Sequence, residues 1–555
     1  MHTEVYLFVL RFVNRRTLSI EQRLFQLRLP DCSMDARTTY KFLEAVCAAC
    51  RGLMLLSVQR DGVAVNAAAF TMLSFTHEEA LDTVCISHGL ALVGKKIPDC
   101  TALRVTRLLS ALMSRSGKAR AAWTTTFSAS PKTMSETRWW SVVECMAFYT
   151  AHIDRLLPFL DSLELGGVST KSVDLIKGLL TRPKMVSGEL AIVNARHDAA
   201  FTEVLALFNN EPAPCEEEIS TGPRTAECAE LPSPPSKTQR LAAAAVAVFE
   251  NAIEDTTPAA SPAPSTQVEQ DKRLLRDLPA TLSGLEEFRL QAAAIMAASD
   301  DLIKATYRLE GDGFLVPFVY AQLQDVRSAL DLSVSGTPPV QVTCAISVIV
   351  GTDEVRAHDL ATYCQALVRP ALTYLDATIL NDAGRYGPLL EVSKYAAIFD
   401  PVTALRLGTQ TTQEFVGRLR ALLSYSEPVP PEEITRYLLL CRTFTYDAVT
   451  AATTAERTKL DEFEALLQQL RREGDRNSRL NGKATAAWEF WKSEQSLPCL
   501  RGLAARVATL VPSSAGPERA FSMIRNKLFN KHNTRQLLDA RSLAVQACFN
   551  DRYRE

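Results

Sequence analysis

The sequence predicts an α+β protein, with a small mixed sheet near the N-terminus, a large all-α block and a helical C-terminal region. Extended apolar runs such as "EVYLFVLRFV" stand near the start of the chain. A segment rich in Pro, Glu, Ser and Thr then interrupts the pattern. From Leu274 to about Leu480, apolar residues recur with the 3.6-residue period of an α-helix. These three observations predict both the fold class and its division along the chain.

The N-terminal part, residues 1–205, predicts strands and helices in alternation. The runs "EVYLFVLRFV" and "SIEQRLFQLRL" are typical of two antiparallel strands, and "DARTTYKFLEAVCAAC" of a helix capped by Asp35. A third extended run, "LMLLSVQRD", ends at Asp61. A helix through "VAVNAAAFTML" and a short strand "DTVCISH" follow. Two antiparallel strands, a helix and a strand that ends in a carboxylate predict a partial α+β sheet.

The middle of the chain predicts a linker followed by helices. In 209–239 and 257–267, Pro, Glu, Ser, Thr and Ala replace the large apolar residues, so we expect a disordered linker over 206–273. Residues 274–484 predict an all-α domain. Its exception is "VQVTCAISVIV", which periodicity alone cannot assign to a strand or to a buried helix.

The C-terminal region, residues 485–555, predicts self-association. Four apolar residues in "LPCLRGLAARVATLV" follow one face of a helix: Leu500, Leu503, Val507 and Leu510. Trp488, Phe490 and Trp491 precede them and are large anchors of the kind that dominate interfaces. For a generic helix these residues belong to the chain's own core, and that alternative stays open.

The second half of the tail predicts a helix that begins near Pro517. Glu518 falls in its first turn, where the helix dipole already favours a carboxylate. Basic residues follow within a few turns: Arg519, Arg525, Lys527, Lys531 and Arg535. They form a local basic patch, although charge on a helix is most often a solvated face.

Composition excludes some classes of protein. With 61 Lys and Arg against 63 Asp and Glu, the net charge of −2 excludes a polycation, so any nucleic-acid contact must come from local patches. The apolar run at Val5 to Val13 is too short to span a bilayer and lacks the features of a signal peptide. The sequence therefore predicts a soluble intracellular protein with no membrane partner.

The 13 cysteines are scattered along the chain and do not form a secreted disulfide framework. Cys47 and Cys50 make a C-x-x-C, but no second Cys or His pair stands nearby at zinc-finger spacing. Small core residues of a helix are the favoured interpretation, and no zinc site is identified. The sequence also contains no Walker loop, Gly-rich dinucleotide turn or H-E-x-x-H helix.

The stretch "SETRWWSVVE" places Arg138 before two adjacent tryptophans, Trp139 and Trp140. Core packing is the ordinary role of such residues. The alternative is a stacking platform, in which the arginine neutralises a phosphate while an indole receives an unpaired base.

Four blocks of the sequence resemble the hAT superfamily of transposases, in order and in context. They are "QRDGVAVNAAAF", "CISHGLALVGKKI", "PKTMSETRWWSVVE" and "FWKSEQSLPCL…VPSSAGPERAFSMIRNKLFNKHN". The last is similar to the family's C-terminal dimerisation region. The resemblance covers about the first 200 and the last 70 residues, and the central part matches in its helical character only.

This resemblance implies an RNase H-like core that a large α-helical insertion divides, in which three acidic residues hold two Mg²⁺ or Mn²⁺ ions for DNA cleavage. By motif, Asp61 resembles the second acid and Glu518 the third, so these two would also be the metal ligands. Cys85 and His88 match the family's C-x-x-H, and Arg138 and Trp139 its Arg-Trp motif. The implied DNA-binding residues are His88, Arg138, Trp139, Arg519, Lys527 and Lys531. The family context favours stacking for Trp139 and leaves Trp140 to the core.

The sequence departs from the family at the first acid. That acid belongs to a first, central strand upstream of "EVYLFVLRFV", and Met1 stands after that position, as it does for the usual N-terminal zinc finger. We therefore expect a transposase-derived nuclear protein, catalytically degenerate, that retains homodimerisation and DNA binding. One alternative is an active DNA transposase whose N-terminus is missing. The second is a helical protein-interaction scaffold.

Overall fold

A computed structural model describes residues 6–14, 16–28, 35–50, 54–134, 139–165, 170–185, 189–190, 192–193, 195, 198, 200–201, 266–311, 313–446 and 474–514. The described part is largely helical, with few strands in small sheets, which confirms the predicted class at this level. It divides into two compact units. The first draws on Met1–Arg107, Lys132–His152 and Arg289–Glu555, and the second on Leu108–Pro131 and Ile153–Phe288.

Within the residues that the structure describes, four strands form two pairs. Strands β1 (Tyr6–Val13) and β2 (Ile20–Arg28) are antiparallel, with an irregular register between Phe8 and Val9. Strands β3 (Ser57–Arg60) and β4 (Leu81–Val84) are parallel. The antiparallel pair is thus confirmed. The run that was expected to end at Asp61 does contain a strand, but β3 is shorter than expected and ends at Arg60. The expected strand "DTVCISH" is too long, because β4 ends at Val84 and Cys85 caps the next helix.

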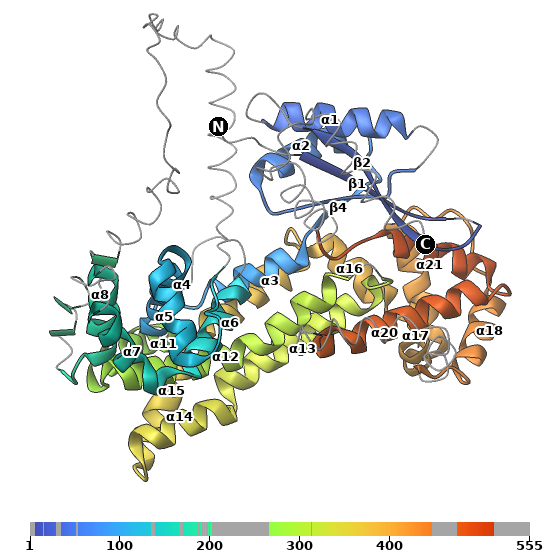
Figure 1. The fold of residues 1–555 in the computed structure, drawn as a ribbon. Helices are drawn as coiled ribbons and strands as arrows, with labels where there is room; N and C mark the ends of the chain where they lie inside the picture. Colours follow the sequence, from blue (N-terminus) through green and yellow to red (C-terminus); the bar gives the residue numbers. More distant parts are fainter. Residues whose placement is uncertain are drawn as a thin grey trace, which may run out of the picture. The chain divides into compact units, whose positions relative to one another are not determined.

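Two helices accompany these strands. Helix α1 (Ala36–Ala49) begins as predicted, with the Asp35 carboxylate accepting a hydrogen bond from the Thr38 amide at 2.7 Å. Helix α2 (Ala64–Ser74) follows β3 and packs along α1, as Figure 1 shows. Apolar residues of α2, including Ala69 and Leu73, are fully buried. Helix α2 therefore forms the connection between the parallel strands β3 and β4.

The other described elements of the first unit are helices and helical turns. They are α3 (Ile86–Gly94), α6 (Trp139–Thr150), α13 (Val316–Ser335), α14 (Val340–Val350), α15 (Glu354–Tyr374), the π-helical turn η2 (Leu375–Ile379), α16 (Gly387–Ala396), η3 (Ala397–Phe399), α17 (Pro401–Leu422), α18 (Pro431–Cys441), α20 (Gly474–Ser493) and α21 (Pro498–Thr509). Helices α4 (Thr101–Arg115) and α12 (Gly284–Leu309) have residues in both units. The run "VQVTCAISVIV" is therefore a helix, α14.

The second unit contains α5 (Gly117–Phe127), α7 (Ile153–Leu165), α8 (Thr170–Thr181), α11 (Thr266–Asp277) and the 3₁₀ turn η1 (Leu278–Thr281). Aromatic packing forms part of its core, with the Trp123 ring 4.1 Å from Phe127 and 5.1 Å from Phe159. Residues 266–273 were expected in the linker, but they form the start of α11. The remaining linker residues, 206–265, lie outside the described residues.

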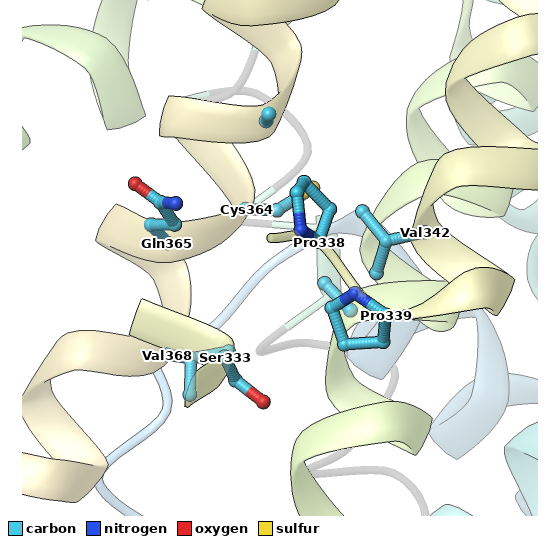
Figure 2. A pocket seen from close by; sticks show the side chains of 9 residues that line it. Ser333, Pro338, Pro339, Val342, Cys364, Gln365 and Val368 are labelled. Carbon is cyan, nitrogen blue, oxygen red and sulfur yellow. The ribbon is translucent and has the colours of Figure 1, made fainter. Parts of the chain in front are cut away.

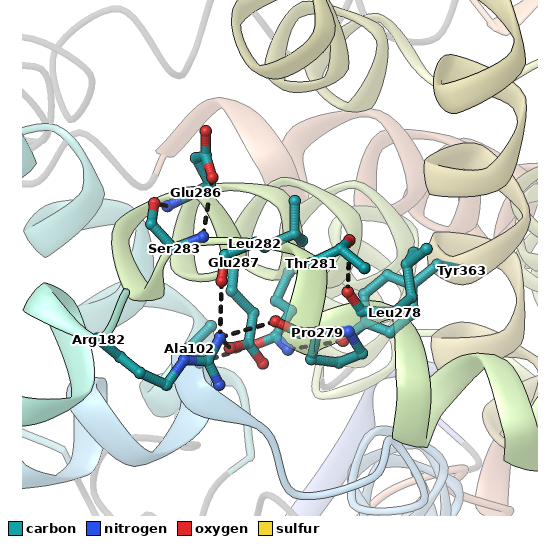
Figure 3. Close-up of polar contacts among 11 residues, drawn as sticks. Ala102, Arg182, Leu278, Pro279, Thr281, Leu282, Ser283, Glu286, Glu287 and Tyr363 are labelled. Carbon is teal, nitrogen blue, oxygen red and sulfur yellow. Dashed lines mark hydrogen bonds and ion pairs between the residues drawn. The ribbon is translucent and has the colours of Figure 1, made fainter. Parts of the chain in front are cut away.

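A buried ion pair holds α8 and α12 together in this unit. The Arg182 guanidinium donates to the Glu287 carboxylate at 2.7 Å, and both side chains are 5% exposed. The same nitrogen, Nη2, donates to the carbonyls of Pro279 at 2.8 Å and Leu282 at 3.1 Å, as Figure 3 shows. One cation therefore satisfies both the carboxylate and the backbone of the turn between α11 and α12.

The apolar face of the tail helix α21 is buried within the chain. Leu500, Leu503 and Val507 are fully buried and Leu510 is 1% exposed, because α21 packs against β1, α13, α18 and α20. Trp491 on α20 is also fully buried, and its indole donates to the Phe399 carbonyl at 2.8 Å. These side chains, which the sequence offered as interface anchors, belong to the chain's own core in the structure.

One stretch within the described residues, Val316–Val350, is long and apolar enough to cross a membrane on the criteria of length and composition. It comprises α13 and α14 and the turn between them. Eight residues of α13 are buried inside the first unit: Val316, Pro317, Phe318, Val319, Leu323, Val326, Leu330 and Val334.

Candidate functional site around helix α3

The Cys-x-x-His motif forms the beginning of helix α3. Cys85 is the N-cap residue, and its sulfur accepts a hydrogen bond from the His88 backbone amide at 3.5 Å. A helix start leaves amides without a partner inside the helix, so a side-chain acceptor three residues earlier stabilises it. The spacing therefore has a structural cause, and the His88 side chain remains exposed between buried neighbours.

The same sulfur binds the tail of the chain. Both the backbone amide and the hydroxyl of Ser514 donate to Cys85 Sγ at 3.2 Å. The Ile86 amide, another donor of the first turn of α3, donates to the Pro512 carbonyl at 2.8 Å. Helix α3 belongs to the second sequence block, and residues 512–514 belong to the last. Hydrogen bonds with these tail residues therefore join the two blocks at the N-terminus of α3.

Burial raises the pKa of the Cys85 thiol, and hydrogen bonds from Ser514 and His88 oppose that rise in part. The group is therefore a neutral thiol near pH 7. It can donate its own proton toward the Ser513 hydroxyl, 3.9 Å away. A buried neutral thiol is a poor nucleophile, so the arrangement indicates a structural junction.

Strand β3 brings the first sequence block to the same place. The Gln59 side chain donates to the Val511 carbonyl at 2.9 Å. Arg60 makes a two-point ion pair with Asp82 of β4, at 2.8 and 2.7 Å. These contacts fix the end of β3, from which Asp61 extends.

Asp61 is half-buried and stabilises the turn that it begins. Its Oδ1 accepts from the Asn66 side chain at 2.7 Å and from the Val63 amide at 3.3 Å. One carboxylate oxygen is therefore engaged in the turn into α2. Within the described part of the chain, no three His, Cys, Asp or Glu side chains gather as metal ligands. Asp61 alone does not fit a two-metal site, and we derive no metal-dependent step.

Trp139 packs against the other end of α3. A methyl group at Gly94 would come within 2.1 Å of the Trp139 indole, which shows that the ring lies directly on the glycine backbone. Trp139 is 4% exposed and Trp140 is 7% exposed. Base stacking on Trp139 therefore requires that α6 separates from α3. The third sequence block thus also converges on this helix.

We expect Gly94→Ala to destabilise the chain by about 1–3 kcal/mol, because the added methyl displaces the Trp139 ring. Thermal unfolding followed by tryptophan fluorescence measures the change. Gly417→Ala is the matched control, since nothing lies within 4 Å of its Cβ position in α17 and the change should be neutral or slightly stabilising. Equal stability of the Gly94 variant and the parent would contradict the packing.

Two cations and two tyrosine rings lie near Gly62 and α3. The Arg385 guanidinium lies 3.4 Å from the Cβ position of Gly62, the neighbour of Asp61. It also donates to the Tyr374 hydroxyl at 3.4 Å and lies 5.1 Å from the Tyr386 ring. Lys96 Nζ, from the second sequence block, lies 4.8 Å from the Tyr374 ring. We call Lys96, Tyr374, Arg385 and Tyr386 the cation–aromatic group.

The π-helical turn η2 positions this group. The turn follows Tyr374 directly and packs on α3, with Ile379 against Gly89. Tyr386 packs on the same glycine, and burial raises the pKa of its hydroxyl to about 12. A methyl at Gly89 would lie 2.8 Å from Ile379 and 2.9 Å from Tyr386. Isolated π-helical turns are frequent at functional sites, which agrees with their position here.

Lys95, Lys96 and Arg385 are exposed cations, and the His88 side chain is also exposed. Asp382, three residues before Arg385, is an exposed carboxylate on the same segment. The Lys96 ammonium group already lies over the face of the Tyr374 ring. The group therefore offers phosphate contacts more readily than a free stacking face. Of the residues that the sequence proposed, Cys85 and His88 form the start of α3, Trp139 packs on its other end, and Asp61 follows β3. Arg138, Glu518, Arg519, Lys527 and Lys531 lie outside the described residues.

Sequence reasoning missed Arg385, Tyr374 and Tyr386. They come from the central helical region, which the family resemblance matches only in its helical character, and no motif marks them. The comparisons with known proteins add no assignment, since no family model, curated protein or solved structure matches this chain.

Proposed function

We propose that this chain derives from an hAT-type transposase and that it binds DNA at the surface around α3. The observation that carries the proposal is the convergence of the four sequence blocks. Cys85, at the start of α3, accepts hydrogen bonds from Ser514, Gln59 donates to Val511, and Trp139 covers Gly94. Residues so far apart in the chain have no local reason to meet, so their association supports a common origin as one site.

The strand pairs support an RNase H-like core as the origin of the sheet. In the proposed core, β1 and β2 are the antiparallel strands that follow the first strand, and β3 and β4 are the parallel strands beyond it. The family's first strand would lie between β1 and β3. The described strands pair in a way that agrees with this order, β1 with β2 and β3 with β4.

The cation–aromatic group supplies the DNA contact in this proposal. Arg385 lies beside Gly62, just after β3, and Lys96 lies over the Tyr374 ring. Both cations are exposed and long enough to reach phosphate oxygens. Contacts to phosphates fix the position of a protein on DNA without reading its sequence. We therefore propose binding that depends strongly on salt and weakly on base sequence.

In this proposal the chain does not cut DNA. The family's chemistry uses three carboxylates, of which the sequence matches two, Asp61 and Glu518. Two carboxylates do not hold both metal ions in position. The proposed function is accordingly DNA binding and self-association by a nuclear, transposase-derived protein.

We expect the purified 555-residue chain to leave supercoiled plasmid and oligonucleotides with terminal inverted repeats intact in Mg²⁺ or Mn²⁺. Gel electrophoresis after incubation measures nicking, with Asp61→Asn prepared in parallel. Metal-dependent nicking by the parent chain that disappears in Asp61→Asn would contradict the degenerate site and favour an active transposase. A folded chain without any DNA affinity would favour the interaction scaffold.

A further inference from the structure

Helix α14 presents an uncovered apolar face. None of its eleven residues, "VQVTCAISVIV", carries a charge. The inner face is covered, since Val342 is 2% and Ile346 6% exposed. Figure 2 shows Val342, Pro338 and Pro339 on one side of a pocket that Cys364 and Val368 of α15 line on the other. On the outer face, Val340 and Val348 are 75% and 70% exposed.

The exposed residues form one stripe. At 3.6 residues per turn, Val340, Cys344 and Val348 follow one another along the helix, and Cys344 lies opposite the buried pair Val342 and Ile346. The helices before and after α14 in the chain also carry exposed apolar side chains, since Leu332 of α13 is 65% and Val355 of α15 is 76% exposed. A group of exposed apolar side chains at helical spacing indicates an interaction surface.

The sequence of α14 is close to symmetric about Cys344. Val340 and Val348 stand four residues on either side, polar Gln341 and Ser347 three, and buried Val342 and Ile346 two. Such a helix is complementary to itself when a second copy lies antiparallel across a two-fold axis at Cys344. In that arrangement Val340 meets Val348 of the partner subunit, and no charge opposes the contact.

We propose that α14 is a contact between two copies of this chain, with Cys344 at the two-fold axis. The contact does not rest on the proposed DNA function. It is also distinct from the predicted tail interface, because the apolar face of α21 is buried in the chain's own core. Among the described residues, α14 is an uncharged helix with exposed apolar side chains at helical spacing, which a second copy can cover.

A lipid surface fits α14 less well than a second copy. Helices that bind membranes carry basic residues beside the apolar face. Here the first charged residues after α14 are Asp353 and Glu354, three and four residues beyond its end, and anionic lipid repels both. The two prolines before α14 also separate it from α13, which carries Asp325, Arg327 and Asp331.

The expected dimer is weak. Eleven helical residues span about 16 Å, so two such helices bury less surface than the roughly 800 Å² per partner of a standard interface. Association should therefore depend on concentration.

Sedimentation velocity of the full chain over a range of concentrations tests the proposal. We expect Val348→Asp to weaken dimerisation at least tenfold, because it places two carboxylates in the contact. Leu439→Asp is the matched control, since Leu439 is 55% exposed on α18 and outside the stripe. Circular dichroism verifies that both variants are folded.

Disulfide trapping supplies the second measurement. Oxidation in air with copper–phenanthroline should link Cys344 to Cys344 between two chains, detected as one linked peptide by mass spectrometry and lost in Cys344→Ser. A monomeric chain at all concentrations overturns the proposal. So does a dimer that Val348→Asp leaves intact and that yields no Cys344 link, which assigns assembly to another surface. Binding of the monomer to anionic vesicles that Val348→Asp abolishes also overturns it, in favour of a lipid surface.

Discussion

Trp491→Ala should destabilise the chain by about 3–5 kcal/mol, the range for removing a large aromatic side chain from a well-packed core. Trp491 is fully buried, and its ring lies 4.9 Å from Tyr437, 5.2 Å from Phe490 and 5.3 Å from Phe399. The substitution also leaves the Phe399 carbonyl without the indole donor at 2.8 Å. The midpoint of urea unfolding measures the loss.

Phe75→Ala is the control for this change, because Phe75 is 79% exposed and its removal should alter the free energy of unfolding by about 0.5 kcal/mol or less. Light scattering of the same samples separates folding from assembly. A Trp491 variant that is as stable as the parent but no longer associates would show that this side chain belongs to an interface, as the tail sequence first suggested.

Arg182→Met should destabilise the second unit by about 3–5 kcal/mol, because it leaves the buried Glu287 carboxylate without its cation. It also removes the donors to the Pro279 and Leu282 carbonyls. Replacing both partners, Arg182→Met with Glu287→Met, should restore part of the loss, since no uncompensated charge then remains buried. Thermal unfolding followed by circular dichroism measures both variants.

Lys177→Met is the matched control in the same unit. Lys177 pairs with Asp161 at 2.7 Å, but the two side chains are 27% and 60% exposed. Solvent screens such a pair, so its loss should cost about 1 kcal/mol or less. Equal effects of the Arg182 and Lys177 substitutions would show that burial does not control the strength of these ion pairs.

Local signals predicted the first elements well. The alternating runs predicted β1 and β2, Asp35 predicted the cap of α1, and the end of β3 at Arg60 lies within one residue of the predicted end at Asp61. The signal failed where one pattern fits two structures. The β-branched run "VQVTCAISVIV" suits a strand as well as a buried helix, and its packing on α15 decides in favour of a helix.

The role of the tail could not be predicted because a helix face buried in a core and one buried in an interface have similar composition. Leu500, Leu503 and Val507 satisfy both interpretations until their neighbours β1, α13 and α18 are known. The position of Arg385 beside Gly62 is a contact between distant parts of the chain. A single sequence carries no signal for such a contact, so the candidate site could be predicted only where motifs marked it.

The salt dependence of DNA binding tests the central claim most directly. Fluorescence anisotropy gives the affinity of the full chain for duplex and single-stranded DNA over a range of salt concentrations. If Lys96 and Arg385 contact phosphates, replacing both with Gln should lower the slope of log affinity against log salt by about two and weaken binding at low salt. The control replaces two exposed arginines of α17, Arg406 and Arg418, with Gln and should leave the slope unchanged. An equal loss in both double variants, or a folded chain that does not bind DNA, would contradict the assignment of a DNA-binding surface around α3.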